Sequence, residues 1–332
     1  MEQSGVGIAL TGSGSAAPDA VLTNDQLSQF VETSDEWIAT RTGIRERRLS
    51  APTESVTQLA AQAARGAIAQ AGIEPADVDL ILLATSTADD LFGSACQVQA
   101  ELGAMQAVAF DITAACSGFV FGLVTAAQFI RTGTYGTVLL IGADVLSRWV
   151  DWNDRRTCIL FGDGAGAVVI QANDRDRLLG FELRSDGTQN KCLNLAYSGE
   201  AKDLLDDCAV SQGGFESITM NGQEVYRFAV KRVPEIIEKA LFRANLNVED
   251  IDWLLLHQAN QRILDAVADR LNIPTDKVIS NLAKYGNTSA ASIPLALDEA
   301  VRSGKIKAGD TIAASGFGAG LTWGAAIFQW GR

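Results

Sequence analysis

Histidine is the scarcest reactive group in this chain, because its 332 residues include only one, His257. Any chemistry that needs an imidazole must use that side chain. The five cysteines form no CxxC pair and are odd in number, which argues against a zinc site and against a disulfide framework. We therefore expect no bound metal, and free thiols in a reducing cytoplasm.

Long apolar runs are also lacking. No stretch of about 18 uninterrupted apolar residues occurs, so no membrane-spanning helix is expected. The first residues, MEQSGVGIALTGSGSAAP, contain no basic segment followed by an apolar run and predict no secretory signal. With a net charge of -13, the molecule as a whole is not expected to bind nucleic acid or an anionic membrane, although a local basic patch is compatible with that charge.

A hidden repeat divides the chain. The segment AGIEPADVDLILLATST, residues 71–87, resembles ANLNVEDIDWLLLHQAN, residues 244–260. Asp79 aligns with Asp252 in this pair, and a second pair of segments, GTVLLIGAD and GDTIAASGF, has the same separation along the chain. The sequence is therefore expected to hold two related halves.

Each half alternates helical and strand patterns in the same order. This alternation predicts an α/β architecture with a largely parallel sheet in each half, and the duplication predicts two such layers related by a pseudo-twofold axis. We assign the first half to residues 1–175 and the second half to residues 176–332. No linker rich in Pro, Gly or Ser separates them, so close packing is expected.

The repeat also indicates where the chemistry lies. Arg131 and Arg302 align with a slightly shorter separation, and that separation carries Cys116 to Asn287, so both are expected to begin equivalent helices. His257 follows a strand pattern of the second half. Because ligands of α/β sheets bind beyond the carboxyl ends of strands, these three polar side chains are expected to converge.

Cys116 precedes a nearly all-apolar pattern that predicts a buried helix over residues 116–130. At a helix N-terminus, the dipole and the free backbone N–H groups favour a negative charge and lower the pKa of a thiol. A thiolate is a good nucleophile toward acyl groups. The alternative is a small buried residue without chemistry, which is the interpretation we keep for the other four cysteines.

His257 and Asn287 offer neutral hydrogen-bond donors. Aimed at one carbonyl oxygen, they would form an oxyanion hole that stabilises an enolate. The same Cys-His-Asn set also fits a cysteine hydrolase, in which the histidine is the base for the thiol and water takes the acyl group. A purely structural histidine is a third possibility, and the three residues alone leave these interpretations open.

Longer motifs make the resemblance to one family specific. The chain resembles β-ketoacyl-acyl-carrier-protein synthase III, the initiating condensing enzyme of dissociated fatty-acid synthesis, almost from end to end. The motifs are SDEWIATRTGIRERR (34–48), ACQVQAELGA (95–104), ACSGF (115–119), FGDGAGAVVI (161–170), HQAN (257–260), YGNTSAASIPLAL (285–297) and GFGAGLTWGAA (316–326). The resemblance implies the thiolase-like fold, a five-layered αβαβα arrangement of two duplicated halves.

The resemblance also implies the reaction of an acyltransferase. Cys116 would take an acyl group from an acyl-CoA, with acetyl-CoA as the expected starter. His257 and Asn287 would promote decarboxylation of malonyl-acyl carrier protein, and the resulting enolate would attack the acyl-cysteine. The products would be 3-oxoacyl-acyl carrier protein, CO2 and CoA. CoA and the carrier's phosphopantetheine are substrates here, so no cofactor is expected.

The resemblance further assigns binding residues. CoA and pantetheine are expected to contact Trp37, Arg41, Arg155, Gly222, Tyr226, Asn260 and Phe317. In a homodimer, Phe92 is expected to close the acyl pocket of the neighbouring protomer. The acidic acyl carrier protein is expected to dock on a local positive patch that contains Arg262, Arg227 and Arg270.

Four positions depart from the family pattern. Tyr226 replaces a phenylalanine, Gly93 a proline, Ala319 a glycine and Asp269 a lysine. The glycine predicts a looser pocket-closing loop, and the aspartate leaves the docking preference open. Two rival functions share the site residues, namely a starter-loading ketosynthase of secondary metabolism and a thioester hydrolase. A non-catalytic binding module would have no chemical reason to retain all three reactive side chains.

Overall fold

Two five-stranded sheets form the framework of the protein in a computed structural model that describes residues 6–332. The first sheet has the order β1 (Gly7–Ala16), β7 (Gly164–Asn173), β6 (Thr137–Asp144), β4 (Leu80–Ala84) and β5 (Val108–Ile112). The second has the order β8 (Leu178–Ser185), β16 (Thr322–Gln329), β15 (Thr311–Gly318), β13 (Trp253–Leu256) and β14 (Val278–Ile279). The two orders match strand for strand, which confirms the predicted duplication.

Each sheet is mixed rather than largely parallel. In the first sheet, β4 pairs in parallel with β5 and β6, whereas the β6–β7 and β7–β1 ladders are antiparallel. The second sheet repeats this arrangement around β13 and β16. The expectation of a largely parallel sheet was therefore wrong for these outer ladders. In the second half, β16 follows β15 through a short turn with no crossover helix, and such a connection joins antiparallel strands.

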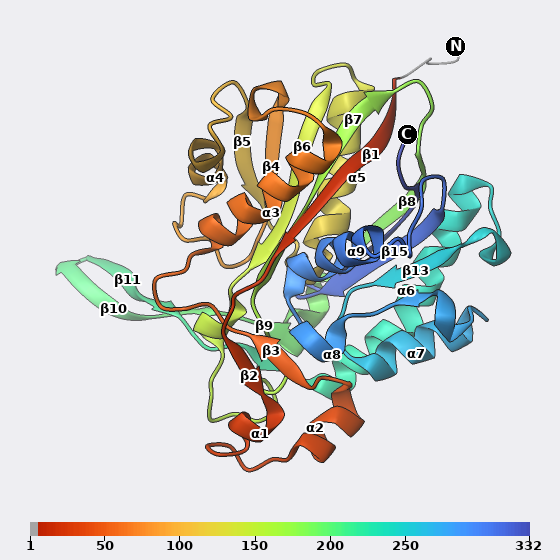
Figure 1. The fold of residues 1–332 in the computed structure, drawn as a ribbon. Coiled ribbons are helices and arrows are strands. Elements are labelled where there is room, and N and C mark those ends of the chain that lie inside the picture. Colours follow the sequence, from red (N-terminus) through yellow and green to blue (C-terminus); the bar gives the residue numbers. More distant parts are fainter. Residues whose placement is uncertain (1–5) are drawn as a thin grey trace.

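Helices cover both faces of each sheet and give five layers (Figure 1). The outer face of the first sheet carries α3 (Val56–Ala71) and α4 (Ala95–Leu102), and that of the second carries α6 (Gly222–Ala244) and α7 (Gln261–Arg270). The central layer holds α5 (Gly118–Arg131) and α9 (Ser292–Arg302). Because sheets enclose these two helices from both sides, most of their residues are buried, as the apolar pattern after Cys116 predicts.

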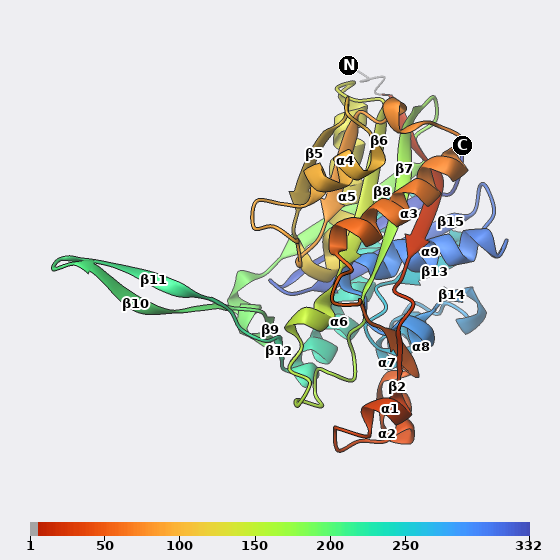
Figure 2. The same ribbon diagram turned by 60° about the vertical axis from the view of Figure 1, so that its left-hand side comes forward.

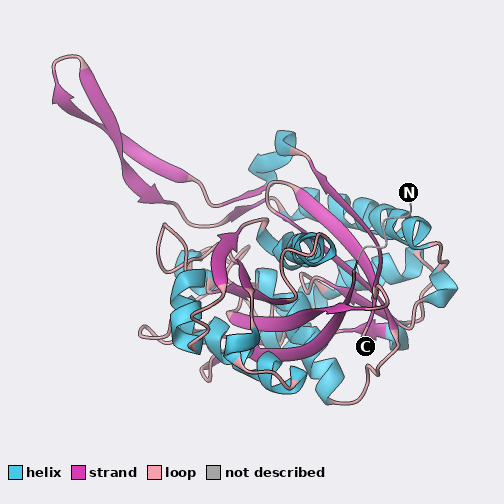
Figure 3. Ribbon diagram, turned by 90° about the horizontal axis from the view of Figure 1, so that it is seen from above, coloured by secondary structure: helices cyan, strands magenta, loops and turns pink. Residues whose placement is uncertain are grey.

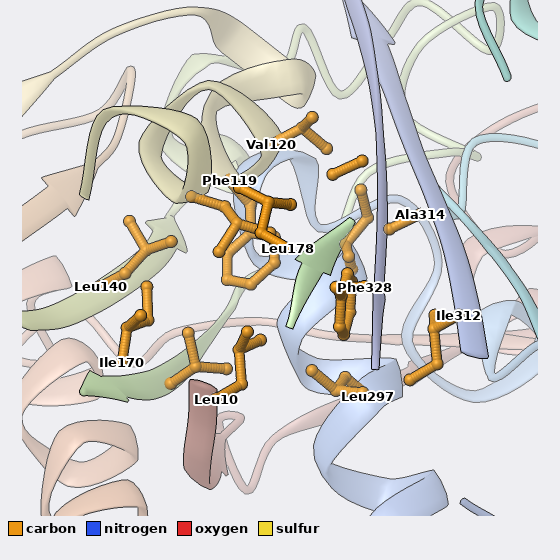
Figure 4. Close-up of a cluster of buried hydrophobic side chains, with 14 of the residues drawn as sticks. Leu10, Phe119, Val120, Leu140, Ile170, Leu178, Leu297, Ile312, Ala314 and Phe328 are labelled. Atoms are coloured by element: carbon orange, nitrogen blue, oxygen red, sulfur yellow. The ribbon is translucent and has the colours of Figure 1, made fainter. Parts of the chain in front are cut away.

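Apolar side chains of the two halves meet in the central layer (Figure 4). Phe119 of α5 and Leu140 of the first sheet belong to the same buried cluster as Ile312 and Phe328 of the second sheet. The division expected at residues 175 and 176 falls in the turn between β7 and β8. It separates the two sheets, while the core between them is shared.

Two aspartates show how closely the halves repeat. The side chain of Asp79 accepts a hydrogen bond from the backbone N–H of Thr137 at 2.9 Å. Asp252 accepts the same bond from the backbone N–H of Thr311 at 2.8 Å. Each carboxylate therefore ties the start of one central strand to the start of its neighbour, and the alignment of these aspartates in the sequence has a structural cause.

The residue-by-residue correspondence between the two halves shifts at the central helices. The short 3-10 turn Ala115–Ser117 leads into α5, and the turn Ser289–Ala291 leads into α9. Since α5 has 14 residues and α9 has 11, residues aligned at the helix ends are not aligned at the helix starts. Cys116 therefore matches Ala290 in structure, and the expectation that Cys116 and Asn287 begin equivalent helices was wrong.

Two further parts of the chain lie outside the five layers. A cap is formed by β2 (Val21–Thr23), α1 (Asn24–Leu27), α2 (Asp35–Thr42) and β3 (Glu46–Arg48), with α8 (Leu282–Tyr285) packed against β3. A hairpin of β10 (Tyr197–Leu205) and β11 (Cys208–Phe215) projects from the body, as Figures 2 and 3 show, and all its residues are exposed. The short ladder of β9 (Leu193–Asn194) and β12 (Thr219–Met220) lies at its base. Within residues 6–332, no helix has the length and apolarity needed to cross a membrane.

Candidate active site

Cys116 lies in the turn that leads into α5, at the boundary between the two halves. The residue is buried, with 6% of its surface exposed. Strand β15 of the second half passes directly beside it. A Cβ atom at Gly318 would lie 2.8 Å from the Cys116 nitrogen, and one at Gly316 would lie 3.0 Å from the Cys116 carbonyl oxygen. Glycine at these two positions lets the strand approach the cysteine closely.

Burial raises the pKa of the Cys116 thiol to about 12. A hydrogen bond with the Ser289 side chain lowers this pKa, and the negative charge of Asp144 raises it, but desolvation is the largest effect. The expectation of a lowered thiol pKa at the helix N-terminus was therefore wrong, because desolvation outweighs it in the free protein. The thiol is protonated at neutral pH, and its proton has to leave as the sulfur attacks.

Asp144, the last residue of β6, is a buried carboxylate next to the site that the sequence analysis missed. Its oxygens accept hydrogen bonds from the backbone N–H groups of Ser86 at 2.8 Å and Ala290 at 3.2 Å, and from the hydroxyls of Thr85 at 3.1 Å and Thr87 at 2.9 Å. Burial raises the pKa of this carboxyl, and a hydrogen bond with Ser289 lowers it. The available signal was a charged residue at the end of an apolar strand pattern.

His257 follows β13 and is 1% exposed. Its backbone N–H donates to the carbonyl of Ser315 at 2.8 Å, and its ring nitrogen Nδ1 lies 2.6 Å from the Ser292 hydroxyl oxygen. The Phe317 ring packs edge-on against the imidazole, with the ring centroids 5.4 Å apart. Burial lowers the pKa of His257 to about 3, so the imidazole is neutral at physiological pH.

Asn287 is held by both its backbone and its side chain. Its backbone N–H donates to the carbonyl of Leu160 at 2.9 Å, and its carbonyl accepts from the N–H of Gly162 at 3.0 Å. The side-chain oxygen Oδ1 accepts from the backbone N–H of Ser289 at 2.9 Å. The bond from Ser289 thus orients the side-chain amide of Asn287 and occupies its oxygen. In the described part of the chain, Nδ2 has no hydrogen-bond partner and can donate to a ligand.

These contacts bring the three reactive side chains predicted from the sequence into one region. Ser289 contacts both Cys116 and Asn287, and β15 runs beside both Cys116 and His257. A buried thiol and two neutral donors suit attack on an acyl group and stabilisation of the oxyanion that follows. Among residues 6–332, no group of three or more His, Cys, Asp or Glu side chains is arranged to hold a metal ion.

Four of the expected CoA-binding residues gather where the cap meets the second half. The Trp37 ring contacts two guanidinium groups, with Arg41 Cζ 4.5 Å and Arg155 Cζ 5.1 Å from its centroid. The side-chain amide of Asn260 donates to the carbonyl of Arg41 at 3.1 Å. Asn260 caps α7 and closes the HQAN motif that His257 begins. Asn260 therefore connects this group to His257, the buried imidazole three residues earlier in the chain.

The other three residues expected to contact CoA or pantetheine do not form one cluster. Gly222 begins α6, where a Cβ atom would have, of the residues the structure describes, only Met220 within 4 Å. Tyr226 lies one turn later, half-buried, with Arg262 Cζ 5.6 Å from its ring centroid. Phe317 is buried beside His257. The structure brings Phe317 into the reactive group and leaves Gly222 on the surface.

A cavity of about 950 Å³ reaches Cys116 from the side of the first sheet. Its lining includes Cys116, Ser289, Phe110, Phe215 and Phe92. Phe92 lies at the rim with 97% of its surface exposed, so it does not close the cavity of its own chain. The cavity is open on the face formed by β5 and the base of the hairpin.

The loop that carries Phe92 is tied down by hydrogen bonds. Gly93 has a φ of 103°, which proline cannot adopt because its ring holds φ near about −65°. The N–H of Gly93 donates to the carbonyl of Asp90 at 2.9 Å, and the N–H of Phe92 donates to the Asp90 carboxylate at 2.9 Å. The N–H of Ser94 donates to Asp111 at 2.9 Å. These hydrogen bonds fix the backbone of the loop in the structure, and the looser loop expected from Gly93 stays a prediction.

The three arginines expected to dock the carrier protein are all exposed. Arg262 lies in the first turn of α7 and Arg270 in its last, which places them roughly 12 Å apart along the helix axis. Arg227 follows Tyr226 on α6, and Tyr226 contacts Arg262. Arg227 and Arg262 therefore lie on neighbouring helices near the cap. Asp269 is also exposed, directly before Arg270, and weakens the positive charge at that end.

Comparison with known proteins identifies the family. The family model described as 3-oxoacyl-[acyl-carrier-protein (ACP)] synthase III matches residues 110–187, and the model for the C-terminal part of that enzyme matches residues 241–330. The β-ketoacyl-[acyl-carrier-protein] synthase III of Trichormus variabilis is 75% identical over 327 residues, which cover 98% of this chain and 99% of the relative. This chain belongs to the β-ketoacyl-acyl-carrier-protein synthase III family. The corresponding protein of Acaryochloris marina is 69% identical over 332 residues, covering 100% of both chains.

Solved structures agree with membership in the synthase III family. The 3-oxoacyl-[acyl-carrier-protein] synthase III of Aquifex aeolicus has a TM-score of 0.89 and 45% identity, covering 98% of this chain and 100% of that one. A priming β-ketosynthase of the R1128 polyketide biosynthetic pathway has a TM-score of 0.91 and 33% identity, covering 99% of this chain and 97% of that one. The synthase III described here is thus an acyltransferase with the duplicated thiolase-like fold, and its reaction is the condensation that initiates fatty-acid synthesis.

Proposed function

We propose that this synthase III joins an acyl group from acyl-CoA, with acetyl-CoA as the starter, to malonyl-acyl carrier protein in the cytoplasm. The observation that carries the proposal is the set of contacts around Cys116. A buried thiol lies near two neutral donors, His257 and Asn287, whose other polar side-chain atoms already have partners. CoA and the carrier are substrates, and no cofactor takes part.

In the first half-reaction, the sulfur of Cys116 attacks the thioester carbonyl of acyl-CoA. A bond forms between this sulfur and the acyl carbon, and the bond from that carbon to the CoA sulfur breaks. CoA leaves as a thiol with the proton that Cys116 gives up. The side chain of Ser289, which lowers the pKa of both the Cys116 thiol and the Asp144 carboxyl, lies beside the proton as it leaves.

In the second half-reaction, malonyl-acyl carrier protein takes the place of CoA. Its thioester oxygen accepts hydrogen bonds from His257 and Asn287, and CO2 leaves with the negative charge passing to that oxygen as an enolate. Neutral donors stabilise this charge without readily protonating the carbanion, because burial keeps the imidazole uncharged. The enolate carbon then attacks the acyl carbon of the acyl-cysteine and forms the carbon–carbon bond, and the bond from that carbon to the cysteine sulfur breaks. The sulfur leaves as a thiolate that takes up a proton from water, and 3-oxoacyl-acyl carrier protein forms.

Substrate entry is assigned to the side of the cap. The Trp37 ring, with Arg41 and Arg155 beside it, suits stacking on the adenine and contact with the phosphates of CoA. Pantetheine would pass Gly222, Tyr226, Asn260 and Phe317 toward the thiol. The exposed arginines at positions 262, 227 and 270 would meet the acidic carrier. An Arg262→Glu variant should raise the KM for the carrier and leave labelling by acyl-CoA unchanged, while Arg175→Glu, on an exposed turn, serves as the control.

The acyl pocket is proposed to be completed by a second copy of the chain. Among the strands of residues 6–332, the edge strand β5 pairs only with β4, and its Val108 and Phe110 are 47% and 37% exposed. Antiparallel pairing of two β5 strands would continue the sheet and carry Phe92 of one protomer to the open cavity of its partner. Sedimentation should give twice the 35.2 kDa of the chain. A Phe110→Lys variant should dissociate, and Phe242→Lys, at an exposed position of α6, should not.

The decisive experiment separates the two half-reactions. The protein is incubated with radiolabelled acetyl-CoA, the labelled peptide is identified by mass, and malonyl-acyl carrier protein is then added. Label on Cys116 that moves into 3-oxobutanoyl-carrier supports the proposal. His257→Ala and Asn287→Ala should retain the label and slow condensation by roughly 100-fold or more. Cys96→Ser, which changes an exposed thiol, is the matched control.

The other outcomes distinguish the rivals. Label that decays to free acetate in the presence of malonyl-carrier would indicate a hydrolase. Labelling only by longer or branched acyl-CoA would keep the mechanism and change the substrate, and the size of the cavity, about 950 Å³, favours testing such starters beside acetyl-CoA. No label from any thioester would remove Cys116 from the mechanism.

A further inference from the structure

Ser292 is a buried hydroxyl beside the imidazole of His257 to which the proposed reaction gives no role. It is the first residue of α9, and only 1% of its surface is exposed. Its Oγ lies 2.6 Å from His257 Nδ1, a short distance for a hydrogen bond between neutral groups. The backbone N–H of Gln258 also points at this oxygen, at 3.4 Å. The hydroxyl thus accepts a hydrogen bond from the N–H of Gln258. It either donates to Nδ1 of His257 or accepts from it, depending on which imidazole nitrogen carries the proton.

The direction of the bond to His257 follows from counting donors. A hydroxyl has one proton to donate and two lone pairs. The N–H of Gln258 occupies one lone pair. If Nδ1 also carried a proton, Ser292 would accept twice, and its own proton would be buried without an acceptor, since no other bond of Oγ is present among residues 6–332. A buried donor without a partner is unfavourable, so Ser292 donates and Nδ1 accepts.

Among residues 6–332, His257 Nδ1 has no hydrogen-bond partner other than the Ser292 hydroxyl. The side chain of Gln258 is fully engaged, because its amide donates to the carbonyls of Leu256 at 2.7 Å and Ile279 at 3.3 Å. Its oxygen accepts from the N–H of Asn281 at 3.1 Å. The Ser292 hydroxyl is therefore the group that decides where the single imidazole proton lies.

We propose that Ser292 is a positioning residue that fixes His257 as the tautomer with its proton on Nε2. The inference rests on the proposed function, in which the imidazole must donate to the oxygen of the enolate. An imidazole protonated on Nδ1 would present a lone pair at Nε2 and would repel that oxygen. In residues 6–332, Nε2 has no hydrogen-bond partner, so its proton is available to a substrate. Ser292 acts on the reaction through His257 and does not touch the reacting atoms.

The chain is suited to a direct test because it contains one histidine. Full-length protein labelled with ¹⁵N-histidine gives the signals of one imidazole, and the two nitrogen shifts report which nitrogen carries the proton. At pH 7 the wild-type protein is expected to show protonated Nε2 and unprotonated Nδ1. The opposite pattern would overturn the proposal, whether or not the protein condenses acetyl and malonyl units.

Variants then test the role of the hydroxyl. Ser292→Ala is expected to give a mixture of tautomers and to lower kcat for condensation by about tenfold, with labelling of Cys116 by acetyl-CoA unchanged. Ser292→Thr, which keeps the hydroxyl, should restore the Nε2 tautomer and kcat. Ser303→Ala removes a hydroxyl that donates to Ala300 just after the same helix and should change neither.

An Ala variant that keeps the wild-type tautomer and kcat would also overturn the proposal. If that variant does not fold, the wild-type nitrogen shifts still decide the direction of the bond. Failure of Cys116 labelling in the wild-type protein would instead contradict the proposed function and leave the tautomer measurement standing on its own.

Discussion

Ala115 and Ser289 occupy the same position in the two halves, and both hold a left-handed backbone, with φ of 46° and 51°. Each residue begins the 3-10 turn that leads into a central helix. Left-handed backbone is unfavourable for residues other than glycine, and it persists where surrounding contacts impose it. Here it places Cys116 within one of these turns and brings Ser289, which begins the other turn, against the cysteine.

The first prediction concerns this backbone conformation. Ala115→Gly should fold with unchanged or slightly higher stability and retain labelling by acetyl-CoA, because glycine adopts positive φ without strain. Ala115→Val should lose about 2 kcal/mol or more of unfolding free energy and label slowly, because β-branched residues rarely tolerate positive φ. Urea unfolding and the labelling rate measure both effects. Equal stability of the two variants would contradict the assigned strain.

The second prediction concerns the contact between β15 and the cysteine. Gly318→Ala places a Cβ atom 2.8 Å from the Cys116 nitrogen, so the turn must shift. We expect a loss of about 1 to 3 kcal/mol in stability and a labelling rate at least about tenfold lower. Gly187→Ala, where the structure shows open space, is the matched control and should behave as wild type. A normal labelling rate in Gly318→Ala would show that the strand does not constrain the thiol.

The third prediction is a pH dependence of the free thiol. Because burial raises the pKa of Cys116 from 9.0 to about 12, the thiolate fraction should still be rising at pH 10. Alkylation of the Cys116 peptide by iodoacetamide, followed by mass spectrometry between pH 7 and about 10, should therefore increase about tenfold per pH unit without reaching a plateau. A plateau near pH 9 would contradict the dominance of burial.

Asp144→Asn provides the matched comparison for that profile. The negative charge of Asp144 raises the pKa of the Cys116 thiol, so its removal should lower that pKa and speed alkylation at a given pH. Asn keeps one oxygen, which can still accept from the N–H of Ser86, whereas an NH2 group replaces the oxygen that accepts from the N–H of Ala290. A slower reaction in this variant would mean that the carboxylate assists the loss of the proton rather than opposing it.

The fourth prediction is the acid sensitivity of folding. His257 has a pKa of about 3 in the folded protein, lowered by burial from 6.5. Between these two pH values the unfolded chain binds a proton at His257 and the folded chain does not. The contribution of the neutral, buried imidazole to the free energy of unfolding is therefore fully present above pH 6.5 and is lost as the pH falls toward about 3. Urea unfolding of the wild type should lose stability between pH 7 and about 5 more steeply than His257→Gln. Parallel curves would contradict the pKa assigned to the buried imidazole.

The duplication could be predicted from the sequence because the starts of equivalent strands repeat the same side chains. Asp79 and Asp252 bind equivalent backbone N–H groups, so the same residue recurs in both halves. The start of the central helices could not be aligned in this way. α5 is longer than α9, and only the left-handed residues Ala115 and Ser289 mark the matching positions. Backbone conformation of this kind has no signature in an alanine or a serine.

The reactive trio could be predicted because cysteine, histidine and asparagine have distinctive chemistry at the ends of apolar segments. Asp144 and Ser292 could not be assigned roles, because their importance depends on which groups they face. The sign of the thiol pKa shift was missed for the same reason, since burial is a property of the assembled layers. The exposed hairpin of β10 and β11 had no apolar alternation to predict it.

Because Gly316 and Gly318 of β15 lie close to Cys116, the exposure of this thiol depends on the distance between the two halves of the chain. One wall of its environment belongs to the first half of the chain and the other to the second. A motion that moves β15 away from the turn Ala115–Ser117 would expose the sulfur while the ladders within each sheet stay paired. Because the cavity already reaches Cys116, a substrate bound between the halves should slow labelling of the thiol by a bulky reagent, both by filling that route and by holding the two sheets together.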